Sequence, residues 1–131
     1  MTTDDRFALE LSKFEKSMGM LREALPEDES PKSRDSLLLR FMFTFETAWK
    51  SMRFKLSERG MEVEDYSAGV LRSAFQARLV TDADTWEQMR KYRNGVAHAY
   101  DEALAIEIAA FVRTRAVPAL EALLARLKQA P

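Results

Sequence analysis

Four side chains close together in the sequence are of types that could do chemistry together: Arg93, Asn94, His98 and Tyr100. They lie in the stretch RNGVAHAYDE, residues 93–102, and His98 is the single histidine of the chain. An imidazole titrates near neutral pH and can act as a general acid or base. A guanidinium can stabilise the negative charge of a phosphoryl transition state. Together they could cleave RNA without a metal, with the RNA's own 2′-hydroxyl as the nucleophile.

The same stretch also fits a helix end that is not a site. In that interpretation Arg93 pairs with an acidic side chain, and His98 satisfies carbonyl groups that a helix end leaves exposed. On a regular helix His98 would lie about 140° round from Arg93, since each residue turns by about 100°. A shared site therefore requires a bend, for which Gly95 is the obvious place, or a second subunit. The residues alone leave both interpretations open.

The helix that must position Arg93 begins near residue 82, where Thr81 or Asp82 can cap it. Trp86 and Met89 have the spacing of an inward face, and Arg93 returns to that face seven residues after Trp86. An arginine on an apolar stripe needs a route to solvent, an acidic partner or an anion to hold. The position of Arg93 therefore favours a specific role for it.

Glu46 is a candidate partner for Arg93, because it lies beside the apolar stripe of an earlier helix. Either it is a partly buried carboxylate that orients Arg93, or it is an ordinary surface charge. Phe41, Phe45 and Trp49 surround it in the sequence, and their helical spacing predicts core packing rather than a platform for stacking bases. Tyr92 is expected to pack as well.

The chain is expected to leave the Arg93 helix between about residues 96 and 100. Asp101 is then the N-cap candidate of a last helix, from about residue 102 to 128. Pro118 lies inside this helix and predicts a kink, because proline cannot donate a backbone hydrogen bond. The apolar stripe expected along this helix comprises Ile106, Ala110, Val117, Leu120, Leu124 and Leu127.

Three further helices are expected before residue 80, separated by breaks at Pro26 and near Gly60. The first has its apolar seam at Phe7, Leu11, Phe14, Met18, Leu21 and Leu25. The second has its seam at Leu38, Met42, Phe45, Trp49, Met52 and Leu56. The third is short, from about Ser67 to Ala77, and is expected to bury Val70, Leu71, Ala74 and Phe75. These patterns predict an all-α fold, an antiparallel up-and-down four-helix bundle with an additional short helix, in a single domain of residues 1–131.

Composition limits the remaining classes of protein. The 20 basic and 21 acidic residues leave a net charge of −1, so no general attraction to nucleic acid or an anionic membrane is expected. There is no cysteine, and a cytoplasmic location is the natural expectation. The acidic first residues predict no signal peptide, and no apolar run is long enough for a membrane span. With one histidine and no thiolate, we expect no metal site and no cofactor.

Two stretches together carry a resemblance to a known family: RFMFTFETAWK at residues 40–50 and RNGVAHAY at residues 93–100. The connecting stretches LRSAFQARLV, residues 71–80, and WEQMRKYRN, residues 86–94, fit as well. The chain resembles the nucleotidyltransferase substrate-binding protein family of the HEPN superfamily, whose toxin members are called HepT-like. The resemblance implies a HEPN-like helical bundle that forms a homodimer. It also implies a partner, a separately encoded minimal nucleotidyltransferase of a toxin–antitoxin pair.

The resemblance also assigns roles to residues. The chain would be the substrate-binding partner subunit of the nucleotidyltransferase, with an Arg-X4-His-X-Tyr site in a cleft at the dimer interface. The alternative is an active metal-independent RNase toxin, in which Arg93 and His98 are catalytic and Asn94 supports them. RNA would then be a further partner, and the nucleotidyltransferase would silence the toxin by adding AMP to Tyr100. The chain departs from many relatives at Ala97, where they carry a hydroxyl residue just before the histidine.

Overall fold

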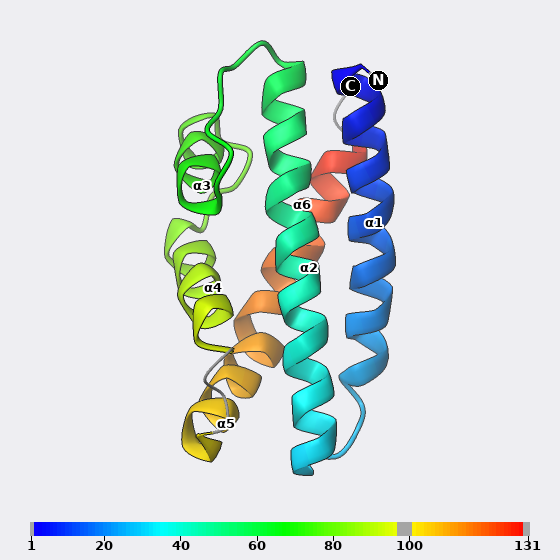
Figure 1. The fold of residues 1–131 in the computed structure, drawn as a ribbon, viewed down its shortest axis with the longest axis vertical. Coiled ribbons are helices and arrows are strands. Elements are labelled where there is room, and N and C mark those ends of the chain that lie inside the picture. Colours follow the sequence, from blue (N-terminus) through cyan, green and yellow to red (C-terminus); the bar gives the residue numbers. More distant parts are fainter. Residues whose placement is uncertain (1, 97–100, 130–131) are drawn as a thin grey trace.

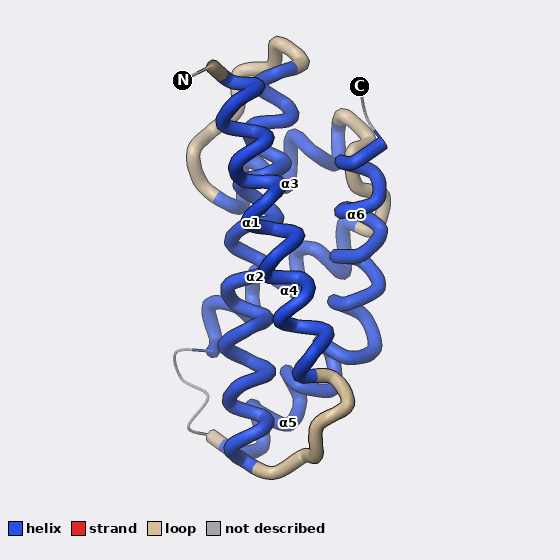
Figure 2. Tube along the Cα trace, turned by 90° about the vertical axis from the view of Figure 1, so that its right-hand side faces the viewer, coloured by secondary structure: helices blue, strands red, loops and turns tan. Residues whose placement is uncertain are grey.

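The computed structural model of the chain describes residues 2–96 and 101–129, and its regular elements there are all helices, without a strand (Figure 2). None of these helices is both long and apolar enough to cross a membrane. The elements are α1 (Thr3–Ala24), α2 (Pro31–Glu58), α3 (Ser67–Gln76), α4 (Ala83–Gly95), α5 (Glu102–Phe111), the π-helical turn η2 (Val112–Ala116) and α6 (Val117–Gln129).

The helices form an up-and-down bundle around α2, which contacts α1, α3, α4, α5 and α6 (Figure 1). Helices α1 and α2 run antiparallel, and α3 and α4 lie on the other side of α2. The segment from α5 through η2 to α6 returns along the bundle, so that α6 ends toward the end where α1 begins. With α5, η2 and α6 as one long arm and α3 as the short extra helix, the predicted all-α four-helix bundle is confirmed.

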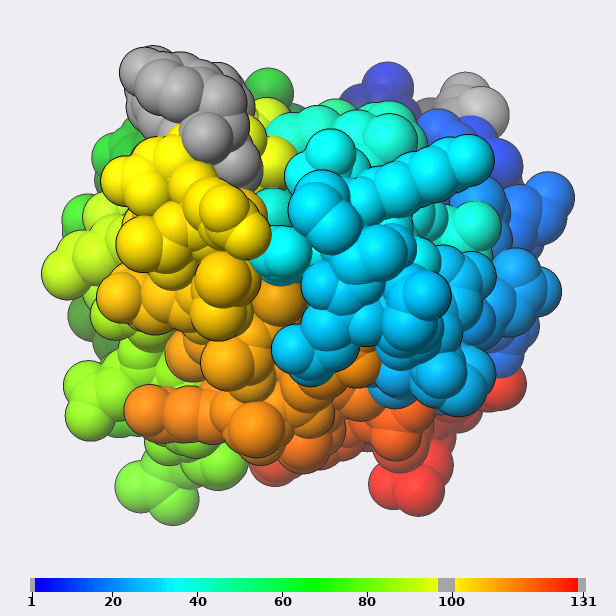
Figure 3. Space-filling model, turned by 90° about the horizontal axis from the view of Figure 1, so that it is seen from below, coloured from blue at the N-terminus to red at the C-terminus, as the bar shows by residue number. Residues whose placement is uncertain are grey.

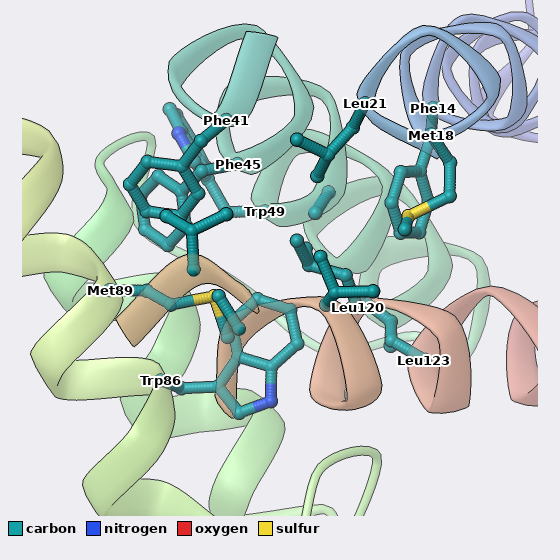
Figure 4. Packing of buried hydrophobic residues seen from close by; sticks show 14 of the residues in the cluster. Phe14, Met18, Leu21, Phe41, Phe45, Trp49, Trp86, Met89, Leu120 and Leu123 are labelled. Atoms are coloured by element: carbon teal, nitrogen blue, oxygen red, sulfur yellow. The ribbon is translucent and has the colours of Figure 1, made fainter. Parts of the chain in front are cut away.

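The core that holds α4 in place is aromatic. Figure 4 shows Trp86 and Met89 pointing from α4 toward Phe41 and Phe45 of α2. The rings of Phe45 and Trp86 are 6.3 Å apart, and Phe41, Phe45 and Met89 are fully buried. Burying one such side chain stabilises the fold by about 1.5–3 kcal/mol. The inward face predicted for the Arg93 helix is therefore confirmed, and so is the core packing of Phe41, Phe45 and Trp49 on α2.

Side-chain caps fix where the helices near the motif begin. Of the two candidates for α4, Asp82 is the cap: its carboxylate accepts a hydrogen bond from the backbone N–H of Thr85. Asp101 caps α5 as predicted, accepting from the backbone N–H groups of Ala103 and Leu104. Such caps satisfy N–H groups that a helix end otherwise leaves without partners. The first residues of α4 and of α5 are thus set by local sequence.

The expected last helix is interrupted. The backbone N–H of Val117 bonds the carbonyl of Val112, five residues back, and residues 112–116 form the π-helical turn η2. Pro118 follows directly in α6. The irregularity expected around this proline is therefore a wider turn that ends just before it.

This turn makes part of the expected apolar stripe wrong. Ile106 is 49% exposed and Ala110 is exposed, whereas Ala105 and Ala109 are buried. The π turn inserts one extra residue, so the buried face upstream of it shifts by one position from the face extrapolated with the α-helical period. Downstream of the turn, the predicted residues Val117, Leu120, Leu124 and Leu127 are buried.

Phe75 is a second correction, because it is 49% exposed rather than buried. The buried face of α3 comprises Gly69, Val70, Leu71 and Ala74. Phe75 stands in the last turn of α3, where it lines a groove between α3 and α4 instead of filling the core.

Candidate functional site

The geometry around Arg93 is built on Glu46. The Nε atom of Arg93, in the last turn of α4, donates to Oε1 of Glu46 on α2 at 2.6 Å. The other carboxylate oxygen of Glu46 accepts from the indole N–H of Trp49 at 3.2 Å. Trp49 is only 8% exposed, so its N–H needs a partner within the fold. Glu46 is thus fixed by donors from two helices, and it fixes the position of Arg93 in turn.

The Arg93–Glu46 pair lies at the edge of the core. The side chain of Arg93 is 37% exposed and that of Glu46 is 27% exposed. The hydrogen bond to Glu46 uses Nε, and a guanidinium carries four more N–H donors on its terminal nitrogens. Arg93 is therefore positioned by one edge of its guanidinium while it keeps donors for an anion. Glu46 is thus a partly buried partner of Arg93. Such a pair fits both the candidate site and the plain helix end, and the role of Glu46 in a site stays a prediction.

Asn94 follows Arg93 on α4 and is exposed. Its supporting role stays a prediction, since an exposed amide beside Arg93 is compatible with a site and with a plain surface. His98 and Tyr100, with Ala97, lie outside the described residues. Their positions relative to Arg93 are thus a matter for experiment.

The bend expected at Gly95 is not found there. Gly95 is the last residue of α4, and Val96 keeps right-handed helical angles. A side-chain carbon added at Gly95 would come no closer than 3.9 Å to Cδ1 of Ile108, which is ordinary contact. The helix therefore continues through Arg93 and Asn94 to Gly95, and Val96 still has helical angles.

A second tie holds the helices on either side of the motif together. The hydroxyl of Tyr92 donates to Oε2 of Glu107 on α5 at 2.6 Å, and its ring meets the edge of Phe111 at 5.0 Å. The hydrogen bond to Glu107, with burial, raises the pKa of Tyr92. The packing role expected for Tyr92 is confirmed. The sequence did not indicate its bond to Glu107, which lies fifteen residues away on another helix.

Arg34 is a residue near this site that the sequence interpretation missed. It is 8% exposed, at the beginning of α2. It stands four residues before Leu38, so it continues the apolar seam of α2 in the way that Arg93 continues that of α4. The same test, a charged residue on an apolar stripe, could have found it.

Clusters of three or more possible metal ligands are absent from residues 2–96 and 101–129. The donors that the described part of the site offers are the guanidinium of Arg93 and the amide of Asn94. Such groups suit the recognition of an anion such as phosphate.

Comparison with known proteins decides the family. The family described as nucleotidyltransferase substrate binding protein like matches residues 9–129. The chain belongs to this family. The match covers α2, α4 and the stretch between α4 and α5, so the resemblance carried by these stretches is confirmed.

Three proteins to which this chain is similar add detail. A solved protein from Thermus thermophilus is 34% identical with a TM-score of 0.81, covering 88% of this chain and 99% of that one. The probable ribonuclease HepT of Haemophilus influenzae is 29% identical over 73 residues, which are 53% of this chain and 50% of that protein. The chain thus matches only about half the length of this curated relative.

The third relative supports the fold. It is the tri-AMPylated HEPN toxin of Shewanella oneidensis, solved in complex with MNT antitoxin. The two structures share 16% identity and a TM-score of 0.78, with 99% of this chain and 100% of that one covered. At this identity the likeness concerns the arrangement of helices, which is the HEPN arrangement in both.

Proposed function

We propose that the chain is the HEPN-type subunit of a toxin–antitoxin pair and binds a separately encoded minimal nucleotidyltransferase. The observation that carries this proposal is the family match over residues 9–129. The Shewanella toxin, which has the same fold, binds an MNT antitoxin. The subunit acts as a homodimer, with the Arg-X4-His-X-Tyr motifs of two copies facing each other across a cleft.

A second function is supported by the position of Arg93, namely that of a metal-independent RNase. In this reaction His98 takes the proton of an RNA 2′-hydroxyl, and the resulting oxygen attacks the neighbouring phosphorus. The bond from phosphorus to the 5′-oxygen breaks, that oxygen takes up a proton, and a 2′,3′-cyclic phosphate forms. Arg93, held through Nε by Glu46, stabilises the charge on the phosphoryl oxygens with its terminal nitrogens. Asn94 orients the phosphate or the imidazole.

Modification of Tyr100 would silence this RNase. Its hydroxyl attacks the α-phosphorus of ATP, pyrophosphate leaves, and the phenolic proton is released. The product places a bulky anion two residues after His98 and seven after Arg93. A phosphate on Tyr100 would then compete with RNA for the guanidinium of Arg93.

One experiment tests both functions. The chain is expressed with and without the nucleotidyltransferase encoded beside it, and supplied with ATP and magnesium. Intact mass and cleavage of RNA are then recorded for wild type, His98→Ala, Tyr100→Phe and Ala97→Ser.

The outcomes separate the two functions. The RNase proposal expects cleavage without added metal, abolished in His98→Ala and kept in Tyr100→Phe. The modification proposal expects mass increments of AMP that disappear in Tyr100→Phe. If only Ala97→Ser cleaves RNA, the missing hydroxyl accounts for an inactive wild type. If the chain neither copurifies with the nucleotidyltransferase nor gains mass, the partner-subunit proposal fails.

A further inference from the structure

A groove of about 610 Å³ lies beside the motif, at the end of the bundle where α2 begins. Its described lining comes from the first turns of α2, from Val96 after α4, and from α5. Figure 3 looks onto this end, with the cyan beginning of α2 beside the yellow α5. In the sequence, residues 97–101 connect two of its lining residues, Val96 and Glu102. The groove therefore includes a residue, Val96, that follows Arg93 by only three positions in the chain.

Arg34 is the buried cation of this groove. Its side chain is 9% exposed, and such a charge requires compensation inside the fold. The described residues supply two contacts of Nη2, the carbonyl of Glu29 at 3.5 Å and Oε1 of Glu102 at 3.9 Å. Both exceed the usual 2.7–3.2 Å of an N–H···O hydrogen bond. The guanidinium is thus held with donors in reserve at the wall of a groove.

Glu102 can leave Arg34 easily. Its side chain is 76% exposed, and ion pairs with so exposed a partner contribute little to stability. When the carboxylate of Glu102 turns into solvent, Arg34 can donate to another anion in its place. In the free protein Glu102 therefore acts as an internal competitor for this position.

The other lining residues limit which anion fits. Asp35 and Glu102 bring two carboxylates to the groove, which disfavour a multiply charged ligand such as a nucleoside triphosphate. The rest of its described lining is apolar: Pro31, Leu38, Leu39, Val96 and Ala105. One arginine beside an apolar wall suits a singly charged phosphodiester with its ribose or base against the wall.

The groove and Arg93 lie along one helix. Arg34 and Glu46, the residue that holds Arg93, are separated on α2 by twelve residues, which is about 18 Å of helix. Val96 lines the groove only three residues after Arg93. A single strand with one phosphate at Arg93 can therefore place another, a few nucleotides away, at Arg34.

We propose that Arg34 is a phosphate-binding subsite for single-stranded RNA whose reacting phosphate lies at Arg93, and that Glu102 occupies this subsite until RNA displaces it. The proposal rests on the RNase function proposed above. Arg34 is then a binding residue for the substrate strand, and Glu102 is the carboxylate that competes with RNA for Arg34.

Binding of RNA without cleavage is the direct test. Fluorescence anisotropy of a labelled oligouridine is measured at several salt concentrations with the full chain carrying His98→Ala. Adding Arg34→Gln should weaken binding about tenfold, as expected for a lost charged hydrogen bond. It should also lower the slope of log affinity against log salt by about 0.7, the loss of one phosphate contact on a single strand. Arg34→Lys should keep the slope.

Glu102→Gln is the decisive arm, because an exposed residue can be replaced without disturbing the core. Removing the competing carboxylate should tighten binding by a factor of about 1.5–5. The matched controls are Arg22→Gln and Glu121→Gln, which make the same changes in an exposed Arg–Glu pair of 2.7 Å between α1 and α6. These helices supply no described residue to the groove. Thermal melting verifies that each variant is folded.

The subsite proposal is overturned if Glu102→Gln tightens binding no more than Glu121→Gln does. It is equally overturned if Arg34→Gln lowers the slope of log affinity against log salt no more than Arg22→Gln does. The same holds if the chain does not bind the oligouridine. Cleavage by the chain with His98 intact is recorded separately. RNA that is bound as expected but not cut contradicts the RNase function alone. RNA that is cut, while the substitutions of Arg34 and Glu102 leave its binding unchanged, contradicts the subsite alone.

Discussion

Glu46 has a task that its closest neutral analogue cannot perform. Its two carboxylate oxygens accept from Arg93 and from Trp49 at the same time. A glutamine offers one carbonyl oxygen and one NH2 group, so one of the two N–H donors would face another donor. The partly buried indole of Trp49 and the guanidinium of Arg93 would then compete for one acceptor. Glu46 therefore links the packing of Trp49 on α2 to the position of Arg93 on α4.

Glu46→Gln is predicted to lower the free energy of unfolding by about 1–2 kcal/mol, because it leaves one N–H donor without an acceptor. Urea unfolding monitored by tryptophan fluorescence measures this change. Glu121→Gln, in the exposed pair with Arg22, is the control and is expected to stay within about 0.5 kcal/mol of wild type. Equal effects of the two variants would make Glu46 an ordinary surface charge.

Tyr92→Phe tests the tie between α4 and α5 through its pH dependence. The hydrogen bond to Glu107 raises the pKa of Tyr92 above its ordinary value of 10.0, so the fold favours the protonated phenol. This contribution is fully present below the pKa of the unfolded chain and is lost as the pH rises through the higher folded pKa. The free energy of unfolding of wild type should exceed that of Tyr92→Phe by about 1 kcal/mol at neutral pH, and this difference should shrink only above about pH 10.

Urea unfolding at a series of pH values measures this difference, and an ultraviolet absorbance titration follows the phenol itself. Tyr66→Phe is the control, because Tyr66 is 50% exposed and its side chain makes no capping hydrogen bond at the start of α3. A difference between wild type and Tyr92→Phe that disappears already at neutral pH would contradict the assigned cause.

At the scale of elements, α4 holds Arg93 and Asn94 in regular helix up to its last residue, Gly95. Asp82 fixes its beginning, and the hydrogen bonds that its carboxylate accepts from the hydroxyl and backbone N–H of Thr85 hold the pKa of this carboxyl below the usual range. Trp86 and Met89 anchor its inward face in the core. Any rearrangement that brings His98 to Arg93 must therefore occur after Val96 or across a subunit boundary.

Gly95→Ala is predicted to be tolerated and to raise the free energy of unfolding by about 0.5 kcal/mol, since Gly95 is helical and has room for a methyl group. Thermal and urea unfolding measure the gain. Gly60→Ala is the contrasting control, because Gly60 has a φ of 86° and an alanine there should cost about 1 kcal/mol. A loss of both stability and RNA cleavage in Gly95→Ala would restore Gly95 as the bend that the site needs.

The sequence predicted best what depends on neighbouring residues. The caps at Asp82 and Asp101 and the seams of the long helices follow from local hydrogen bonding and a period of 3.6 residues. The π turn at residues 112–116 was not predictable from that period, and it displaced the buried face from Ile106 to Ala105. Contacts between distant helices, such as that of Tyr92 with Glu107, leave no periodic signal either.

The candidate site shows the same division between local and distant features. Arg93 and Glu46 were found because each interrupts or borders an apolar stripe, and their contact at 2.6 Å agrees with that reasoning. Arg34 was missed although it interrupts the stripe of α2 in the same manner. Its partner Glu102 lies on α5, more than 60 residues away in the sequence. The contact between the two residues could therefore be recognised only from the packed helices.

At the scale of the whole molecule, α2 presents an apolar ridge to solvent near the motif. Leu39 is 47% exposed and Phe43 is 52% exposed, one helical turn apart on the same face. Leu39 also lines the groove that contains Arg34. If the proposed homodimer buries this ridge, the two copies bring their grooves and motifs together, because a two-fold interface pairs the same surface from each subunit.

Phe43→Asp is therefore predicted to weaken the dimer by about a hundredfold or more, since an aromatic anchor contributes about 2 kcal/mol or more and is lost from both subunits. Light scattering coupled to size-exclusion chromatography should show the mass falling from dimer to monomer as the protein is diluted. Phe75→Asp is the matched control, because Phe75 is 49% exposed but lies on α3. If the cleft between subunits is the site, RNA cleavage falls in parallel with the mass in Phe43→Asp and is kept in Phe75→Asp. A dimer that survives Phe43→Asp but dissociates in Phe75→Asp would place the interface on α3 and separate the two motifs.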